Sequence, residues 1–394
     1  MQSDAQKYAL RGVSANKTDV HNAIQNLDKG LYPLAFCKIL PDFVAGDVNY
    51  CNIMHADTAG TKTSLAYMYW RETDDLSVWR GIVQDSIVMN LDDMACVGCV
   101  DDIILSSTIG RNKNLISGDV VKTLIEATVE FADKMRSYGI QIHLAGGETA
   151  DVGDIVRTID VGYTAFARMK RKELIVNDVK AGDVIVGFSS YGQSSYEDAY
   201  NGGMGSNGLT SARHDVLNAV YRTKYPESFS PETPLSVVYT GNKNLTDTLD
   251  IDNQSITVGK LLLSPTRTYL PLLKEILAHT DRSKIHGIIH NTGGGQTKVL
   301  KFVKNKHIIK NNLFEVPPLF KMIQSESATD WREMYQVFNM GHRLELYCDE
   351  KIAENLVSVG KMFNIEAKIV GYVQNSDNGQ EKLTIDSQEG VFEY

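Results

Sequence analysis

The segment Ile140-Gln141-Ile142-His143-Leu144-Ala145-Gly146-Gly147-Glu148-Thr149-Ala150 is the most informative stretch of the chain. Its alternating apolar residues predict a β-strand, and it follows a helix predicted over residues 118–138, which Gly139 can end. Two glycines after the apolar residues let a ligand approach the backbone closely, while Glu148 and Thr149 add polar groups. The segment therefore predicts a binding site at the end of a strand.

A second string of this kind follows a strand predicted over residues 49–56. It reads Asp57-Thr58-Ala59-Gly60-Thr61-Lys62. An acid after a strand can hold Mg²⁺, small residues let phosphate approach the backbone, and Lys62 can neutralise the phosphate. The glycine spacing is not that of a Walker A loop. Taken alone, the string is more often an ordinary turn than a phosphate site.

Three acids, Asp85, Asp92 and Asp93, lie along one side of a helix predicted over residues 76–98. A solvated helix face is the simple alternative. Asp92 and Asp93, however, stand in an apolar segment, where unpaired acids are unfavourable. A shared cation would stabilise them, so the sequence predicts a metal site beside the Asp57 turn.

Two further strings lie in the second half of the chain. Residues 203–209 match G-x-G-x-x-G but do not directly follow a strand, so the dinucleotide interpretation fails its context test. Backbone amides before a helix beginning near Leu209 could still hold phosphate. The string His290-Asn291-Thr292-Gly293-Gly294-Gly295 ends an apolar strand. His290 is a candidate for proton transfer there, although a lone histidine is usually structural.

Composition limits the class of protein. The chain has 394 residues, 43% apolar and 23% charged, and a formal net charge of −9, which disfavours nucleic acid and anionic membranes as partners. No segment has the length of a membrane span or of a signal peptide. Five cysteines, an odd number, favour a reducing cytoplasm, and we interpret Cys96 and Cys99 as buried residues at a helix end rather than a redox or zinc motif.

Length and pattern predict two domains of the α+β class. We place an N-terminal domain at residues 1–172 and a C-terminal domain at residues 173–394. The C-terminal domain contains a polar insertion near residues 222–258, which we expect to run over the surface.

The pattern also predicts individual elements. Residues 63–70 read as a strand and residues 266–278 as a helix. Residues 377–379 predict a hairpin turn that joins a strand over residues 367–373 to one over residues 383–385.

Taken together and in this order, the strings resemble the aminoimidazole ribonucleotide synthetase family over nearly the whole chain. Gly146 to Ala150 matches its G-G-E-T-A outright. The other similar strings are Asp57 to Lys62 (D-G-V-G-T-K), Ser206 to Gly208 (S-N-G), Leu262 to Tyr269 (L-L-A-P-T-R-I-Y), His290 to Gly295 (H-I-T-G-G-G) and Met334 to Gly341 (M-Y-R-T-F-N-C-G).

The resemblance implies two α+β domains and a homodimer in which the N-terminal sheets pack together. It also implies a reaction: formylglycinamidine ribonucleotide and ATP, with Mg²⁺, give aminoimidazole ribonucleotide, ADP and phosphate. The N-terminal domain would then bind ATP and metal and form the dimer.

The resemblance further assigns roles by position. It implies metal ligands at Asp57, Asp93 and Glu148. The nucleotide would contact these and Gly60, Thr61, Lys62, Gly146, Gly147 and Thr149. His290, Lys62 and Asp93 would be catalytic. Ser206, Asn207, Thr292, Gly293 and Gly294 would hold the substrate phosphate.

Three departures keep other functions open. The family string G-V-D-I-D-A-G is Gly12 to Thr18 here and has lost its acids, Ala59 replaces a glycine, and Gly205 stands where the family has histidine. The nearest alternative is another ATP-dependent small-molecule kinase of the same superfamily, such as thiamine-monophosphate kinase. A non-catalytic nucleotide-binding dimer is the alternative from another class.

Overall fold

The N-terminal half forms a five-stranded sheet. The computed structural model describes residues 9–13, 22–23 and 26–394, so most of the departing string Gly12 to Thr18 lies outside the described residues. The strand order is β1-β2-β5-β3-β4, with β3 and β4 parallel and the other pairs antiparallel. The bounds are β1 Ile39–Pro41, β2 Tyr50–Thr58, β3 Ile103–Arg111, β4 Ile142–Asp151 and β5 Ile159–Lys170.

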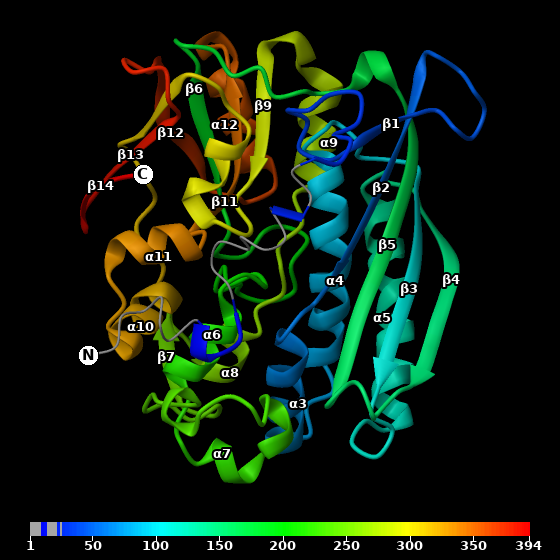
Figure 1. Cartoon of the computed structure of the whole chain (residues 1–394), viewed down its shortest axis with the longest axis vertical. Coiled ribbons are helices and arrows are strands. Elements are labelled where there is room, and N and C mark those ends of the chain that lie inside the picture. Colours follow the sequence, from blue (N-terminus) through cyan, green and yellow to red (C-terminus); the bar gives the residue numbers. More distant parts are fainter. Residues whose placement is uncertain (1–8, 14–21, 24–25) are drawn as a thin grey trace.

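Helices α4 (Val78–Ala95) and α5 (Gly118–Ser137) cover one face of this sheet (Figure 1). The alternation in β5 explains this, because Tyr163, Ala165 and Ala167 are buried while Thr164 and Phe166 between them are only partly buried. Both helices and the strand β2 are confirmed close to their predicted bounds, which were residues 76–98, 118–138 and 49–56.

The strand predicted over residues 63–70 is wrong, since α3 (Lys62–Thr73) is a helix. Its aromatic and branched residues suggested a strand. The helix is buried on several sides, from Leu65 to Tyr69, so it shows no helical alternation of polar and apolar residues.

The G-G-E-T-A string is part of a strand and not a loop after one. Strand β4 continues through Gly146 and Glu148 to Asp151. It is an edge strand, and residues 143–149 are all exposed. Side chains that point to both faces of β4 are therefore open to solvent in a single chain.

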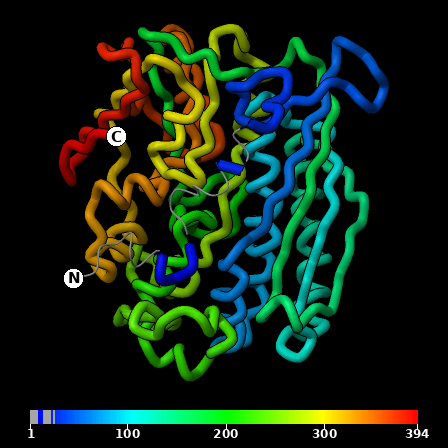
Figure 2. The backbone as a smooth tube through the Cα atoms, viewed as in Figure 1, coloured from blue at the N-terminus to red at the C-terminus, as the bar shows by residue number. Residues whose placement is uncertain are grey.

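The C-terminal half forms a seven-stranded sheet beside the first (Figures 1 and 2). Its order is β14-β13-β10-β12-β6-β11-β9. The bounds are β6 Val184–Ser189, β9 Ile285–His290, β10 Lys306–Lys310, β11 His342–Cys348, β12 Ala367–Asn375, β13 Lys382–Ser387 and β14 Gly390–Glu393. The predicted hairpin is wrong, because β10 lies between β12 and β13 and pairs with both. The predicted α+β class is confirmed in both halves.

The remaining elements surround the second sheet. They are α6 Leu209–Val216, α7 Tyr221–Lys224, β7 Thr248–Ile251, β8 Gln254–Thr257, α8 Val258–Leu262, α9 Leu270–His279, α10 Pro318–Ser327, α11 Trp331–Val337 and α12 Glu350–Met362. The helix predicted over residues 266–278 begins only at Leu270. No helix in the described part of the chain is long and apolar enough to cross a membrane.

The insertion at residues 222–258 contacts both domains. Phe229, Val238 and Tyr239 are buried in it, so it is more than the surface excursion that its polar composition suggested. The Tyr67 hydroxyl of α3 donates to Glu227 at 2.5 Å. Arg157, which precedes β5, donates to the main-chain oxygens of residues 226 and 227. The insertion therefore ties the second domain to the first.

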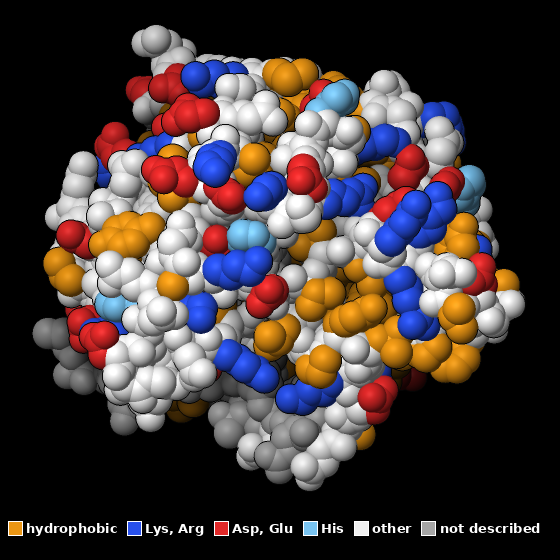
Figure 3. Space-filling model, turned by 90° about the horizontal axis from the view of Figure 1, so that it is seen from above, with side chains coloured by type: hydrophobic (Ala, Val, Ile, Leu, Met, Phe, Trp, Pro, Cys, Tyr) orange, Lys and Arg blue, Asp and Glu red, His pale blue; other side chains and the backbone are white. Residues whose placement is uncertain are grey.

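Surface charge agrees with the composition. On the face in Figure 3, Lys and Arg side chains are intermixed with Asp and Glu side chains, and a hydrophobic area lies among them. Such a mixed surface does not suit a polyanion.

Candidate functional site

The acids of α4 hold the two domains together. Asp85 Oδ1 accepts hydrogen bonds from the Thr266 main-chain nitrogen at 2.8 Å and from its hydroxyl at 2.6 Å. Asp92 accepts from the Thr268 hydroxyl at 2.8 Å and from the Tyr269 main-chain nitrogen at 2.9 Å. Protein donors therefore satisfy both oxygens of Asp92, so Asp92 does not need the expected cation in this arrangement. Asp85 is satisfied at Oδ1 only, because its Oδ2 has no partner among the described residues.

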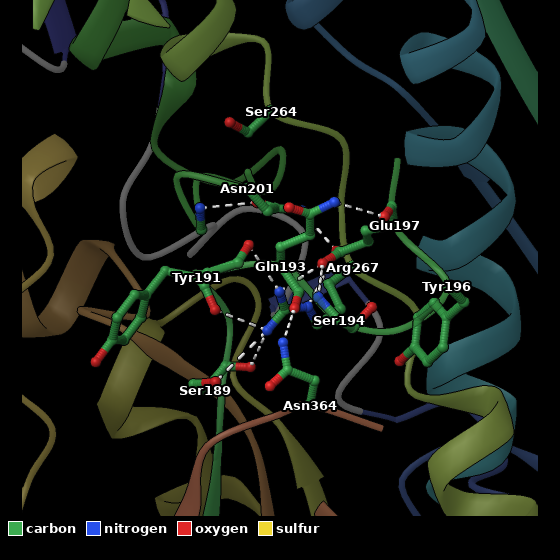
Figure 4. Close-up of polar contacts among 12 residues, drawn as sticks. Ser189, Tyr191, Gln193, Ser194, Tyr196, Glu197, Asn201, Ser264, Arg267 and Asn364 are labelled. Carbon is green, nitrogen blue, oxygen red and sulfur yellow. Dashed lines mark hydrogen bonds and ion pairs between the residues drawn. The ribbon is translucent and has the colours of Figure 1, made fainter. Parts of the chain in front are cut away.

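These bonds explain why α9 starts late. Residues 264–269 form no helix, and along this segment Thr266 reaches Asp85 while Thr268 and Tyr269 reach Asp92. Arg267 points the other way, into the second domain (Figure 4). Its guanidinium pairs with Glu197 at 2.5 Å and also donates to main-chain oxygens of Ser189, Tyr191 and Gly192. Arg267 therefore anchors the segment from behind.

Lys62 belongs to the same boundary and is fully buried. Its Nζ donates to Asp85 Oδ1 at 2.9 Å, the Gly205 oxygen at 3.2 Å and the Ser264 oxygen at 2.6 Å. An ammonium group has three donors, so none is left for a phosphate in this arrangement. The expected contact of Lys62 with ATP would need one of these bonds to open.

Asp93 joins histidines of the two domains. His290, at the end of β9, donates through Nδ1 to Asp93 Oδ1 at 2.7 Å. His55 of β2 places Nε2 3.4 Å from Asp93 Oδ2 and Nδ1 3.0 Å from Asn90 Oδ1. On its other side His290 Nε2 accepts from Arg343 Nε at 3.1 Å. A buried polar chain therefore runs from β2 through Asp93 and His290 to β11.

The pKa values of this chain follow from its contacts. Burial raises the pKa of Asp92 to about 7. Burial acts on Asp93 as well, but hydrogen bonds from His290 and His55 outweigh it and hold the pKa of Asp93 well below its usual range. Burial also lowers the pKa of His290, so a neutral ring with its proton on Nδ1 fits both of its neighbours. His290 has no exposed surface, and a role in proton transfer requires one of its two bonds to open.

The three expected metal ligands do not meet within one chain. The path across the sheet from Asp57 to Glu148 crosses two strands. Thr58, next to Asp57, pairs with Gly162 of β5, and Gly162 pairs in turn with Thr108 of β3. Thr108 pairs with Glu148 of β4. Three strand spacings separate them by about 14 Å, too far for one Mg²⁺. No group of three or more His, Cys, Asp or Glu in the described ranges could hold a metal. The three carboxylates of a single chain therefore do not fit one ion.

The glycine-rich strings do approach one another. The Thr61 hydroxyl, before α3, lies 2.7 Å from the Thr210 hydroxyl at the start of α6. This contact brings together the N-terminal ends of two helices, which favour negative charge. A β-carbon on Gly60 would meet no atom within 4 Å, so open space lies beside the turn. The turn and the start of α6 thus lie side by side at the boundary between the domains.

The expected substrate strings also converge. A β-carbon on Gly293 would lie 3.5 Å from the Asn207 amide nitrogen. The Asn291 main-chain nitrogen donates to the Arg343 oxygen at 2.6 Å, which sets this loop against β11. Lys298 Nζ lies 3.4 Å from the Thr292 hydroxyl. Ser206, Asn207 and Thr292 to Gly294 therefore lie on adjoining loops of the second domain, next to His290.

Two family models match the chain in sequence order. Residues 42–169 match the AIR synthase related protein, N-terminal domain, and residues 180–383 match the AIR synthase related protein, C-terminal domain. The chain belongs to the AIR synthase related family. Its two sheets correspond to the two matched regions.

Relatives within this family cover most of the chain. The phosphoribosylformylglycinamidine cyclo-ligase of Methanocaldococcus jannaschii is 28% identical over 83% of this chain and 79% of its own length. The cyclo-ligase of Methanococcoides burtonii is 27% identical over 94% of this chain and 88% of its own.

Solved structures show the same fold at low identity. Thermotoga maritima PurL, complexed with ADP, gives a TM-score of 0.54 at 13% identity over 98% of this chain. The present chain spans about half the length of PurL, 50%. A chain of a HypE-HypF complex gives a TM-score of 0.54 at 13% identity and is covered over 98% of its length.

Sequence reasoning missed several residues of the domain boundary in this AIR synthase related chain. His55 and Arg343 complete the chain through Asp93 and His290, and Thr266 and Thr268 satisfy α4. Thr266 and Thr268 belong to the string Leu262 to Tyr269 that resembles the family. The sequence of that string alone does not show which carboxylate each hydroxyl will bind.

Proposed function

We propose that this chain is an ATP-dependent cyclo-ligase that closes formylglycinamidine ribonucleotide to aminoimidazole ribonucleotide in purine biosynthesis. The observation that carries the proposal is the convergence of the S-N-G and T-G-G-G loops beside the junction of α3 and α6, in a chain whose relatives are cyclo-ligases. Phosphate of a ribonucleotide and phosphates of ATP would then lie in one cleft.

The chemistry is mainly positioning. An amide oxygen leaves poorly, so transfer of the γ-phosphoryl group to that oxygen makes an imidate. The amidine nitrogen then attacks the imidate carbon, phosphate leaves with the oxygen, and the ring closes. Holding both substrates in reacting geometry accounts for much of such a rate. Gly60, Thr61 and the amides that begin α3 would contact ATP, and Ser206, Asn207, Thr292, Gly293 and Gly294 the ribonucleotide.

We further propose a homodimer formed through the N-terminal sheet. The sheet face away from α4 carries a row of apolar side chains in register: Met54, Phe166 and Ile104, of which Met54 is 61% exposed and Ile104 42% exposed. Strand β4 adds an exposed edge. A second copy would cover both.

The proposed dimer also determines which chain could supply each Mg²⁺ ligand. Because Asp57 and Glu148 of one chain are about 14 Å apart, a metal site with both acids needs Glu148, Gly146, Gly147 and Thr149 to come from the second copy. Asp93 is bound to His290 in the single chain, so its expected part in the metal site would need that bond to open. All five cysteines are free and buried, which agrees with a cytoplasmic location.

The test is turnover. Purified protein with ATP, Mg²⁺ and formylglycinamidine ribonucleotide should release ADP and an equal amount of aminoimidazole ribonucleotide, detected as an aromatic amine. ADP release without the amine would favour the kinase alternative. Nucleotide binding without ADP release would favour the non-catalytic dimer.

A further inference from the structure

Arg343 is a buried cation without a carboxylate partner. Its side chain is on β11, only 2% of its surface is exposed, and no carboxylate oxygen in the described part of the chain lies within 4 Å of it. Its Nε donates to His290, and its Nη2 donates to the Arg267 oxygen at 2.5 Å. Its Nη1 has no partner among the described residues. A buried charge in that state is unfavourable unless an anion binds.

The neighbouring Arg267 shows what a structural arginine looks like here. All three of its nitrogens are bonded, and Glu197 neutralises the charge (Figure 4). Arg343 differs in both respects. Its neutral partners, bonded to Nε and Nη2, fix the plane of the guanidinium and leave the Nη1 amino group at a defined place.

That place is the Gly205–Ser206 turn. A β-carbon on Gly205 would lie 2.8 Å from Arg343 Nη1, and Gly205 has φ +67°, so the position requires glycine on both grounds. The hydroxyl of Ser206, the next residue, is buried and also has no partner. Two unsatisfied donors from different elements therefore lie at one turn of the candidate substrate site.

We propose that Arg343 Nη1 and the Ser206 hydroxyl bind a phosphate monoester, that of the phosphorylated sugar substrate. This inference rests on the proposed function for the identity of the substrate, but the binding that it predicts does not depend on turnover. His290 then acts as a positioning residue. With its own orientation set by Asp93, it holds the Arg343 fork in place.

Phosphate could come from the sugar, from the nucleotide or from free phosphate, and calorimetric titration separates these. Wild type and Arg343→Gln are each titrated with ribose 5-phosphate, ADP and inorganic phosphate. Because Arg343→Gln loses a charge-assisted hydrogen bond, its affinity for ribose 5-phosphate should be about 10- to 100-fold weaker than that of wild type. Its affinity for ADP should stay within about twofold of the wild-type value. Equal affinity of both proteins for ribose 5-phosphate, or no binding by wild type, overturns the proposal. Selective loss of ADP or of inorganic phosphate alone also overturns it.

Two further variants guard against a folding defect. Ser206→Ala removes an unpaired hydroxyl, so this variant should fold normally and bind ribose 5-phosphate about 3- to 10-fold more weakly than wild type. An unchanged affinity counts against the site. Arg213→Gln is the matched control. Arg213 is another buried arginine with an unpaired nitrogen, but it contacts Ser228 and Tyr239 of the insertion, so its loss should not change ribose 5-phosphate affinity.

The turnover assay tests the cyclo-ligase assignment, and the binding assay tests the phosphate site. A wild type that binds ribose 5-phosphate through Arg343 but makes no aminoimidazole product refutes the cyclo-ligase assignment and keeps this site. A wild type that turns over while Arg343→Gln binds ribose 5-phosphate normally refutes this site and keeps the assignment.

Discussion

Two regions of this chain carry acids in the strings that suggested its function, and the acids behave differently. On α4, Asp85, Asp92 and Asp93 are buried, and each accepts hydrogen bonds from the second domain. On β4, Glu148 lies on an exposed edge strand. An acid in a motif can thus serve assembly or ligand binding, and burial with hydrogen bonds from the other domain distinguishes the two. Variants on α4 should therefore affect stability, and variants on β4 should affect activity alone.

The largest effect is expected at β4. Glu148→Gln keeps the shape of the side chain and removes the charge proposed to serve the nucleotide and metal. We expect a fall in kcat of about 100-fold or more with an unchanged midpoint of thermal unfolding, because the residue is exposed. Exposed His143 on the same strand provides the control, and His143→Gln should keep full activity. An active Glu148→Gln enzyme would remove β4 from the site.

The next effect is expected at the α4 boundary. Lys62→Met leaves Asp85 as a buried charge without its ion pair, so the free energy of unfolding should fall by about 3–5 kcal/mol in urea denaturation. Adding Asp85→Asn should recover part of that loss. Lys122→Met, at an exposed pair on α5, should change it by less than about 0.5 kcal/mol. A loss below about 1 kcal/mol in Lys62→Met would show that the boundary does not depend on this pair.

A smaller effect is expected at the sheet face. Met54→Glu puts a charge into the proposed dimer contact and should weaken self-association about 30-fold or more, measured by sedimentation velocity. The monomer should remain folded, since Met54 is 61% exposed in the single chain. Val391→Glu on β14, 64% exposed, should leave the oligomeric state unchanged. If both variants sediment like wild type, the sheet face is not the interface.

The last prediction concerns the pH dependence of stability. Asp92 has a pKa of about 7 when folded and near 3.8 when unfolded, so the folded state keeps a proton that the unfolded state releases. This group therefore makes stability fall as pH rises from about 4 to about 7, by about 1.4 kcal/mol per pH unit. The stability difference between wild type and Asp92→Asn should shift in that direction between pH 5 and pH 7. A constant difference would show that Asp92 is ionised throughout.

Local patterns predicted much of the fold. The helix from Gly118 was predictable because its apolar face is regular. Helix α3 was missed because it is buried on several sides. The strand β10 between β12 and β13 was missed because a turn at residues 377–379 says nothing about a strand some 70 residues earlier.

The sequence predicted which segments belong to the candidate site, but not how their side chains are arranged. The S-N-G and T-G-G-G loops do lie together, which order alone suggested. Lys62 and Asp93 are buried and form hydrogen bonds with residues about 140 to 200 positions away in the sequence. Local sequence patterns do not show such distant partners. Arg343 could not be recognised without coordinates, because only the space above Gly205 shows where it points.

The strand order of the second sheet has a consequence for biosynthesis. Among the described residues, the interior strand β6, Val184–Ser189, pairs with β11 and β12 alone, which begin at residues 342 and 367. The first sheet is complete once Lys170 has been made. During translation the N-terminal sheet can therefore fold early, while an apolar β6 waits for more than 150 further residues before it finds a neighbour. A ribosome that stalls in that interval would expose this strand to chaperones and to aggregation.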